Sequence, residues 1–301
     1  MFCCCRYATM AAAMTCPLCE YDGPAQQQQR FEPYAVVRCP RCGLSRLQPQ
    51  PSAAELLALY DDPAYFLGSG GAAAGYRENY AELQNCLRNS FQHDLDFLAH
   101  YAPRGELLEV GCGYGTFLEL ARARGYEVRG LEVSADAAAH AEGALGDLVV
   151  RSTLEQYSAA HPGSADVLYC SHVIEHVPDP RLFAAAAARV LRPSGWLICV
   201  TPNQHSLLAR LSGRRWVSYK IPEHLFFFDP LTLGRLLAPH FDLLRVDPAW
   251  QFYPLPMVAD RLRRLLDPLS RIIPRIEHWP ALARRALRVH DGSMRALARR
   301  K

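Results

Sequence analysis

The amino-acid sequence predicts an α/β fold with a parallel sheet, and three adjoining features lead to this prediction. A short apolar strand, Leu107–Val110, runs into a glycine-rich loop, Gly111–Gly115, and the loop opens a helix over Thr116–Arg124. Gly125 ends that helix, and a second strand follows over Tyr126–Glu132. Strand, helix and strand in this order form a βαβ unit, whose strands lie parallel and whose faces are covered by helices.

The same alternation continues downstream and extends the sheet. Aspartate followed by proline is a helix-start signal, and it occurs twice, at Asp179–Pro180 and at Asp229–Pro230. Apolar strands are expected around these helices, at residues 164–170, 196–202 and 241–246. Half of the 301 residues are apolar, so a sizeable core can be buried. No apolar run reaches the roughly 18 residues that a membrane-spanning helix needs.

Two acids flank the glycine loop, and they bear on its ligand. The pattern is E-x-G-x-G-x-G, with Glu109 ahead of Gly111, Gly113 and Gly115, and Glu132 ends the second strand. The dinucleotide fingerprint G-x-G-x-x-G holds a pyrophosphate, which a carboxylate at Glu109 would repel. The same carboxylate would attract a cationic amino acid, and an acid at Glu132 can accept hydrogen bonds from both hydroxyls of a ribose. The loop therefore favours S-adenosylmethionine (SAM), which has an ammonium and a sulfonium group and no phosphate.

Over residues 100–250 the chain resembles the class I SAM-dependent methyltransferases, in the branch that includes quinone-biosynthesis and sugar methyltransferases. The resemblance rests on five segments in the family's order: "LLEVGCGYG", "GLEVS", "ADVLYCSHVIEHVPDP", "RVLRPSGWLICVTPN" and "HLFFFDPLTLGRLL". It implies a Rossmann-like, seven-stranded sheet of order 3-2-1-4-5-7-6 whose last strand is antiparallel. It also implies that Ser171, after the fourth strand, contacts the cofactor.

The segment "SHVIEH" contains the candidate catalytic residues. His172, Glu175 and His176 stand at i, i+3 and i+4, so one helical turn would present them on the same face. Three hypotheses stay open. His176 or Glu175 accepts a proton from the substrate, or the three residues bind a divalent cation, as an acid–acid–His cluster does in some resembling quinone O-methyltransferases, or His176 is structural. His224 is a second base candidate, in a long insertion at 203–228 that is expected to form either a lid or a packed edge.

The N-terminal segment has the spacing of a four-thiolate zinc site. Cys16 and Cys19 form one C-x-x-C pair, and Cys39 and Cys42 form another after nineteen intervening residues. A strand is expected at Tyr34–Arg38. Four thiolates leave no open coordination position, so a zinc ion here is expected to be structural. Metal binding supplies on the order of 10 kcal/mol of folding free energy in such small modules.

The sequence predicts five parts along the chain. The N-terminus, "MFCCCRYATMAAAMT", is a poor signal peptide, and translation is expected to start at Met10 or Met14. Helices are expected at Ala53–Tyr60 and from Arg77 to Ala99. The predicted parts are a non-structural N-terminus (1–13), a zinc-ribbon-like segment (14–48), a helical linker (49–99), a SAM-dependent methyltransferase domain (100–256) and a basic helical tail (257–301).

The tail is more basic than the rest of the chain. Met257–Lys301 carries a net charge of +8, whereas the remainder carries −5. Such a tail either contacts a membrane surface or other anionic groups, or is a solvated helix of an arginine-rich protein. Eleven cysteines without a secretion signal favour a reduced, cytoplasmic setting.

These features predict an enzyme that moves a methyl group from SAM to an oxygen or carbon nucleophile of a small molecule. Sugar nucleotides, glycan or lipid precursors and quinone-like compounds are the expected acceptors. The alternative is an RNA methyltransferase that grips nucleic acid with the zinc ribbon and the basic tail. Nucleic acid is the less favoured partner, because the chain has neither an "NPPY"-type segment nor a Pro-Cys nucleophile.

Overall fold

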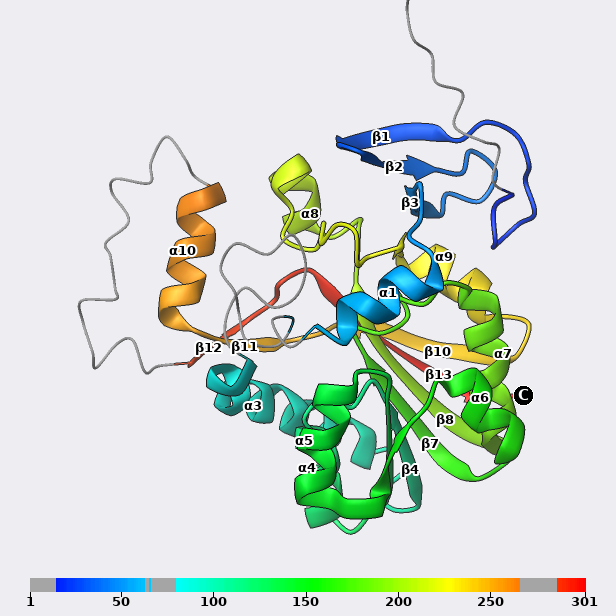
Figure 1. Cartoon of the computed structure of the whole chain (residues 1–301), viewed down its shortest axis with the longest axis vertical. Helices are drawn as coiled ribbons and strands as arrows, with labels where there is room; N and C mark the ends of the chain where they lie inside the picture. The colour runs from blue at the N-terminus through cyan, green and yellow to red at the C-terminus, as the bar shows by residue number, and fades with distance from the viewer. Residues whose placement is uncertain (1–14, 63–64, 66–79, 266–285) are drawn as a thin grey trace, which may run out of the picture.

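The structure, a computed structural model of the whole chain, describes residues 15–62, 65, 80–265 and 286–301. Its centre is a seven-stranded sheet, and a small four-stranded sheet lies at one end of the molecule (Figure 1). Among the described residues, no helix combines the length and apolar character that a membrane span requires. The predicted non-structural N-terminus (1–13) and a glycine-rich stretch at residues 68–75 of the predicted linker lie outside the described residues.

The seven-stranded sheet has the predicted order and directions. Its strands lie in the order β10-β13-β8-β7-β4-β5-β6, which corresponds to 6-7-5-4-1-2-3 along the sequence. Neighbouring strands from β8 to β6 are parallel, whereas β13 is antiparallel to both β8 and β10. The bounds are β4 (Glu106–Val110), β5 (Glu127–Glu132), β6 (Val149–Arg151), β7 (Ala165–Ser171), β8 (Leu191–Pro202), β10 (Phe241–Pro248) and β13 (Ser293–Arg300).

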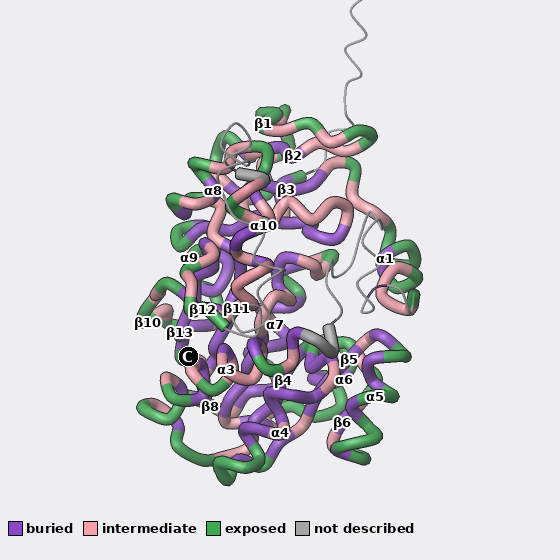
Figure 2. The backbone as a smooth tube through the Cα atoms, turned by 90° about the vertical axis from the view of Figure 1, so that its left-hand side faces the viewer, coloured by how far each residue is buried: buried purple, intermediate pink, exposed green. Residues whose placement is uncertain are grey.

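Helices cover both faces of this sheet, as its continuous apolar strands require. Helices α3 (Tyr80–Ala99), α4 (Thr116–Ala123) and α5 (Ala135–Leu145) pack on one face, and α6 (Leu154–Ala160), α7 (Pro180–Val190) and α9 (Pro230–Leu237) pack on the other. The predicted helix starts are confirmed, because Asp179 and Asp229 each accept two backbone N–H bonds at the first turn of α7 and α9. The backbone is buried through the central strands and exposed along β1 (Gln26–Phe31) of the small sheet (Figure 2).

The prediction of a helical tail is wrong for the last sixteen residues. Helix α10 (Leu255–Leu265) follows the short strand β11 (Gln251–Pro254), but the chain ends in β12 (Ala286–Val289) and β13. Alanine and arginine favour helices in isolation, which made "SMRALARR" look helical. In the fold, this segment fills the gap between β8 and β10, where Ala296, Leu297 and Ala298 are fully buried. Tertiary packing therefore overrides local propensity, and the tail supplies the seventh strand.

The zinc-ribbon-like segment is tied into the main domain. The predicted strand at Tyr34–Arg38 is β2, which pairs with β1 and with β3 (Ser45–Gln48). Strand β3 also pairs with β9 (Phe226–Phe227), which belongs to the insertion after β8. That insertion also contains the short helix α8 (Leu207–Ser212), and its Tyr219 packs at a tilt against Phe31 of β1 with ring centroids 5.2 Å apart. The small sheet thus extends beyond the predicted 14–48 boundary.

Candidate active site

The glycine loop is held to the second strand by Glu132. The Gly113 N–H donates to Glu132 Oε2 at 2.8 Å, and the N–H groups of Val133 and Ser134 donate to Oε1 at 2.8 and 2.9 Å. Burial raises the pKa of Glu132, although these three donors act in the opposite direction. The carboxylate keeps acceptor capacity for a further donor, because its two oxygens offer about four lone-pair sites.

Two of the loop glycines occupy positions that larger residues would not fit. Gly111 and Gly115 have φ angles of 70° and 80°, in the left-handed region that favours glycine. A Cβ at Gly111 would lie 2.6 Å from Val173, and one at Gly115 would lie 2.7 Å from Leu145. Gly115 is also the N-cap of α4, so the loop delivers the N-terminus of that helix to the carboxyl edge of the sheet.

Glu109 is a buried acid with spare hydrogen-bonding capacity. Its side chain is 3% exposed, and its Oε2 has no hydrogen-bond partner among the described residues. Burial and the nearby charge of Glu132 raise the pKa of Glu109 well above its usual range. An unpartnered buried carboxylate is costly, so this oxygen fits a cationic donor such as the ammonium group of SAM. Ser171 ends β7 at the same edge of the sheet and is partly buried.

The predicted helical turn after β7 is instead a tight turn over residues 173–176, which follows directly after His172. His172 has a φ of 56°, which a helix does not allow, so the three predicted residues do not share one helical face. Glu175 is fully buried, and its carboxylate accepts from Thr201 at 2.8 Å and pairs with His172 Nδ1 at 3.2 Å. Burial raises the pKa of Glu175, but the hydrogen bond from His172 and the neighbouring imidazoles lower it below its usual value. Glu175 is thus a charged anchor for the turn and a poor proton acceptor.

His176 and His224 come together although 47 residues separate them in the sequence. Their rings meet edge to face with centroids 4.6 Å apart. Burial lowers the pKa of His176 and lowers that of His224 well below the usual value, and the proximity of His176 lowers that of His224 further. His224 Nδ1 is buried without a hydrogen-bond partner among the described residues. Both imidazoles are therefore neutral near pH 7, the state that can accept a proton.

The described residues at this turn whose ligand atoms could meet at one metal ion form a different trio from the predicted one. The described residues that bring one ligand atom each to within 4.8 Å of one another are Glu175, His176 and His224. His172 is not in this group, because its ring turns to the Glu175 carboxylate.

The end of helix α1 (Ala53–Tyr60) also reaches the site, which sequence reasoning missed. Tyr60 Oη lies 3.0 Å from His176 Nδ1, and the Tyr65 hydroxyl donates to Glu223 Oε2 at 2.7 Å. The sequence placed both tyrosines in a linker, where nothing indicated that the chain folds back over the turn after β7. Thr201 was missed for a similar reason, since it looks like an ordinary residue at the end of a strand.

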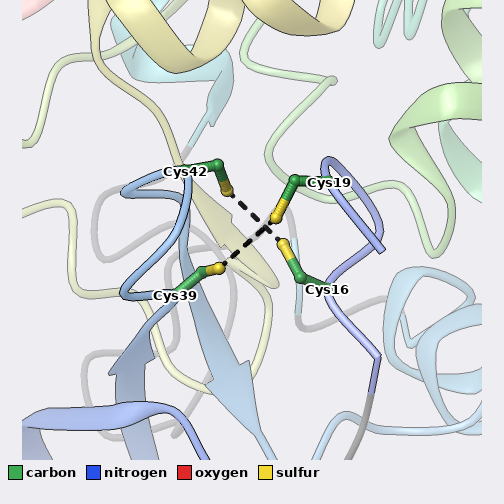
Figure 3. A group of neighbouring side chains, drawn as sticks. All are labelled: Cys16, Cys19, Cys39 and Cys42. Carbon is green, nitrogen blue, oxygen red and sulfur yellow. Dashed lines mark hydrogen bonds between the residues drawn. The ribbon is translucent and has the colours of Figure 1, made fainter. Parts of the chain in front are cut away.

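The four predicted zinc ligands converge on one point (Figure 3). The Cys16 and Cys42 sulfurs lie 3.5 Å apart, as do those of Cys19 and Cys39. Tetrahedral zinc with bonds of about 2.3 Å holds its sulfurs about 3.8 Å apart, so the arrangement fits that ion closely. Burial raises the pKa of Cys39, but hydrogen bonds from the Cys42 and Arg41 backbone outweigh it and lower this pKa to about 7.

Curated relatives share part of this chain. The chain is 34% identical over 143 residues to a ubiquinone biosynthesis O-methyltransferase from Thiobacillus denitrificans. The aligned region covers 44% of this chain and 61% of that protein. It is also 36% identical over 124 residues to the enzyme of the same name from Pectobacterium carotovorum, and that alignment covers 39% of this chain and 52% of the relative. The chain therefore spans about half to three-fifths of the length of these relatives.

Solved structures share the fold at low identity. A SAM-dependent methyltransferase from Archaeoglobus fulgidus aligns with a TM-score of 0.51 and 21% identity over 73% of this chain and 98% of that one. One from Thermotoga maritima aligns with a TM-score of 0.50 and 19% identity over 74% and 95%. A family model described as "Methyltransferase domain" matches residues 82–240, just over half of the chain. The protein thus belongs to the methyltransferase domain family and has the class I, SAM-dependent methyltransferase fold.

Proposed function

We propose that the protein transfers the methyl group of SAM to a hydroxyl oxygen of a small molecule, of which a quinone-like phenol is the favoured class. The observation that carries this proposal is the pair of neutral imidazoles, His176 and His224, on the carboxyl side of β7. A phenol must lose its proton as its oxygen attacks, and a neutral histidine can accept it. The O-methyltransferase names of the curated relatives support the same acceptor atom.

The chain's own residues divide into two roles around the donor. Bound SAM supplies an electrophilic methyl group on a sulfonium, and the carbon–sulfur bond breaks as the carbon–oxygen bond forms. Glu109 is free to bind the ammonium group, and Glu132 has one acceptor position left for a ribose hydroxyl. The partly buried His176 takes the acceptor's proton, while the fully buried His224 is the second candidate. Glu175 holds the turn that carries His176 rather than taking the proton.

We also propose that Cys16, Cys19, Cys39 and Cys42 bind a structural zinc ion. Besides the geometry, the position of the site in the chain supports this role. Strand β3 follows the second cysteine pair in the sequence and pairs with β9. At the start of β9, the N–H groups of Leu225 and Phe226 donate to the Glu175 carbonyl at 2.8 and 3.1 Å. A rigid zinc centre therefore stabilises the strand that follows His224.

A small-molecule acceptor is favoured over nucleic acid or a membrane as the main partner. In the part of the tail that the structure describes, several arginines have internal contacts. Arg295 pairs with buried Asp94 at 2.7 Å, Arg299 lies over the Trp196 ring, and Arg300 donates to the Leu191 carbonyl. Contact of the tail with anionic groups and a cytoplasmic location remain predictions.

The acceptor class is tested by methyl transfer from radiolabelled SAM. The zinc-loaded full chain is offered catechols and hydroxylated quinone precursors, nucleotide sugars, and total RNA in parallel. We expect label in the phenolic ether and the same rate with and without added Mg²⁺, under conditions that keep the four-cysteine site loaded with zinc. Label in RNA that is lost at high salt would replace the proposal with the nucleic-acid alternative. Phenol methylation that requires added Mg²⁺ would instead assign Glu175, His176 and His224 to a catalytic cation.

A further inference from the structure

The last residue of helix α1 and the residues after it contact both sides of the active site. On the cofactor side, Asp61 accepts from the Ala135 N–H at the start of α5 at 2.8 Å and pairs with Arg151 of β6 at 3.0 Å. On the acceptor side, Tyr60 meets His176, and Tyr65 donates to Glu223. Tyr60, Asp61 and Tyr65 are each held by a side-chain contact, so the Tyr60 side chain has a defined position.

Tyr60 is well placed to control the His176 ring. Its hydroxyl lies 3.0 Å from Nδ1, and the two rings meet edge to face with centroids 6.1 Å apart. Tyr65 also packs edge to face against Tyr60, with ring centroids 5.2 Å apart. Burial raises the pKa of Tyr60, so it remains a neutral phenol across the pH range in which histidine titrates.

We propose that Tyr60 is a positioning residue for the reaction: its oxygen accepts a hydrogen bond from His176 Nδ1–H and keeps Nε2 unprotonated for the substrate. The proposal rests on the proposed function, because it assigns the proton-accepting atom of that site. A neutral imidazole carries one proton, so a hydrogen bond that favours Nδ1–H leaves the lone pair on Nε2. After the acceptor's proton moves to Nε2, the same Tyr60 oxygen stabilises Nδ1–H of the imidazolium.

Several other groups act on His176, and Tyr60 is distinguished from them by its hydrogen bond to Nδ1. The charged or titratable side chains that influence or touch His176 come from its own turn and from the insertion after β8: His172, Glu175, Lys220, Glu223 and His224. The carboxylates raise the pKa of His176, and Lys220 and His172 lower it. Removing the Tyr60 hydroxyl leaves all of these charges in place and removes only the partner of Nδ1.

The experiment compares Tyr60→Phe with Tyr126→Phe in the zinc-loaded full chain. Tyr126 is a matched control, because it also loses a buried hydroxyl bond, a 2.6 Å contact with the Ala102 carbonyl on the opposite edge of the sheet. We expect kcat/KM of Tyr60→Phe to fall about tenfold, equivalent to ~1.4 kcal/mol. The acid limb of its pH profile should move to lower pH, since the imidazolium loses an acceptor. The Kd for SAM should stay unchanged in both variants.

A second measurement is independent of turnover. Nitrogen-15 NMR of the histidine rings, with S-adenosylhomocysteine bound, reports which nitrogen of His176 carries the proton. The proposal predicts Nδ1–H in the wild type and in Tyr126→Phe, and a tautomer mixture in Tyr60→Phe. It is overturned if the wild-type ring carries its proton on Nε2, or if Tyr60→Phe and Tyr126→Phe have the same pH profile. If His176→Asn kept full activity while the NMR result held, the proposed base would fail but the Tyr60 hydrogen bond would stand.

Discussion

The cofactor side and the acceptor side of this active site are built in different ways. The cofactor side comes from one continuous βαβ stretch, residues 106–134, in which Glu132 bonds a loop only nineteen positions away. The acceptor side is assembled from α1, the turn after β7, the end of β8 and the insertion behind it, and Tyr60 meets His176 across 116 positions. A self-contained side should survive damage to the other, whereas an assembled side depends on every segment that contributes to it.

Loss of zinc should produce the largest difference between the two sides: the acceptor side should fail while the cofactor side still binds SAM. Metal binding contributes on the order of 10 kcal/mol to folding in four-cysteine modules, so Cys39→Ser is expected to unfold the ribbon and release β9. Methyl transfer should then fall sharply while SAM still binds, as measured by single-turnover rates and calorimetry. Cys86→Ser is the control, because Cys86 is a buried cysteine of α3 outside the four-cysteine group. Equal loss of SAM binding and transfer in Cys39→Ser would show that the ribbon supports the whole domain.

Damage to the seven-stranded sheet and its covering helices, which support both sides of the site, should affect both sides together. Arg295 of β13 and Asp94 of α3 form a buried ion pair, and Asp94 also accepts from the Tyr169 hydroxyl at 2.7 Å. Arg295→Leu leaves a buried carboxylate unpaired, which should cost about 3–5 kcal/mol of unfolding free energy. Arg299→Leu, at an exposed position of the same strand, should cost about 1 kcal/mol or less. Urea denaturation measures the unfolding free energy of both variants. Similar losses of unfolding free energy in the two would contradict a structural role for the Arg295–Asp94 pair.

Glu109→Gln should weaken the cofactor side alone. Loss of a charged hydrogen bond of about 1.5–3 kcal/mol corresponds to a roughly 10- to 100-fold higher Kd for SAM. Because a bound cation favours the ionised carboxylate, wild-type affinity should rise with pH until Glu109 is ionised in the free protein, and Glu109→Gln should lose this dependence. The raised pKa also means that ionising Glu109 costs folding stability above its unfolded pKa. The variant should therefore melt higher than the wild type without SAM at neutral pH. A lower melting temperature together with unchanged affinity would contradict the assignment.

The same contrast explains what the sequence could predict. Glu109 and the glycines follow from a local pattern, and the sheet order follows from the family resemblance, so the cofactor side and the layout of the core were predictable. The seventh strand was not, because Ala296 and Ala298 form a strand only when β8 and β10 lie on either side. Tyr60 was missed because its contact is long-range, and His172 was misplaced because a left-handed residue leaves little sequence signal outside glycine.

The most direct test measures SAM binding and single-turnover methylation of a catechol in the same preparation of His176→Asn. The account predicts an unchanged Kd for SAM and a methyl-transfer rate reduced about 10²- to 10⁴-fold, the usual contribution of a general base. His161→Asn, a histidine stacked on Tyr157 of α6, should match the wild type in both measurements. A full transfer rate in His176→Asn, or loss of SAM binding in parallel with transfer, would contradict the division of the site into two sides.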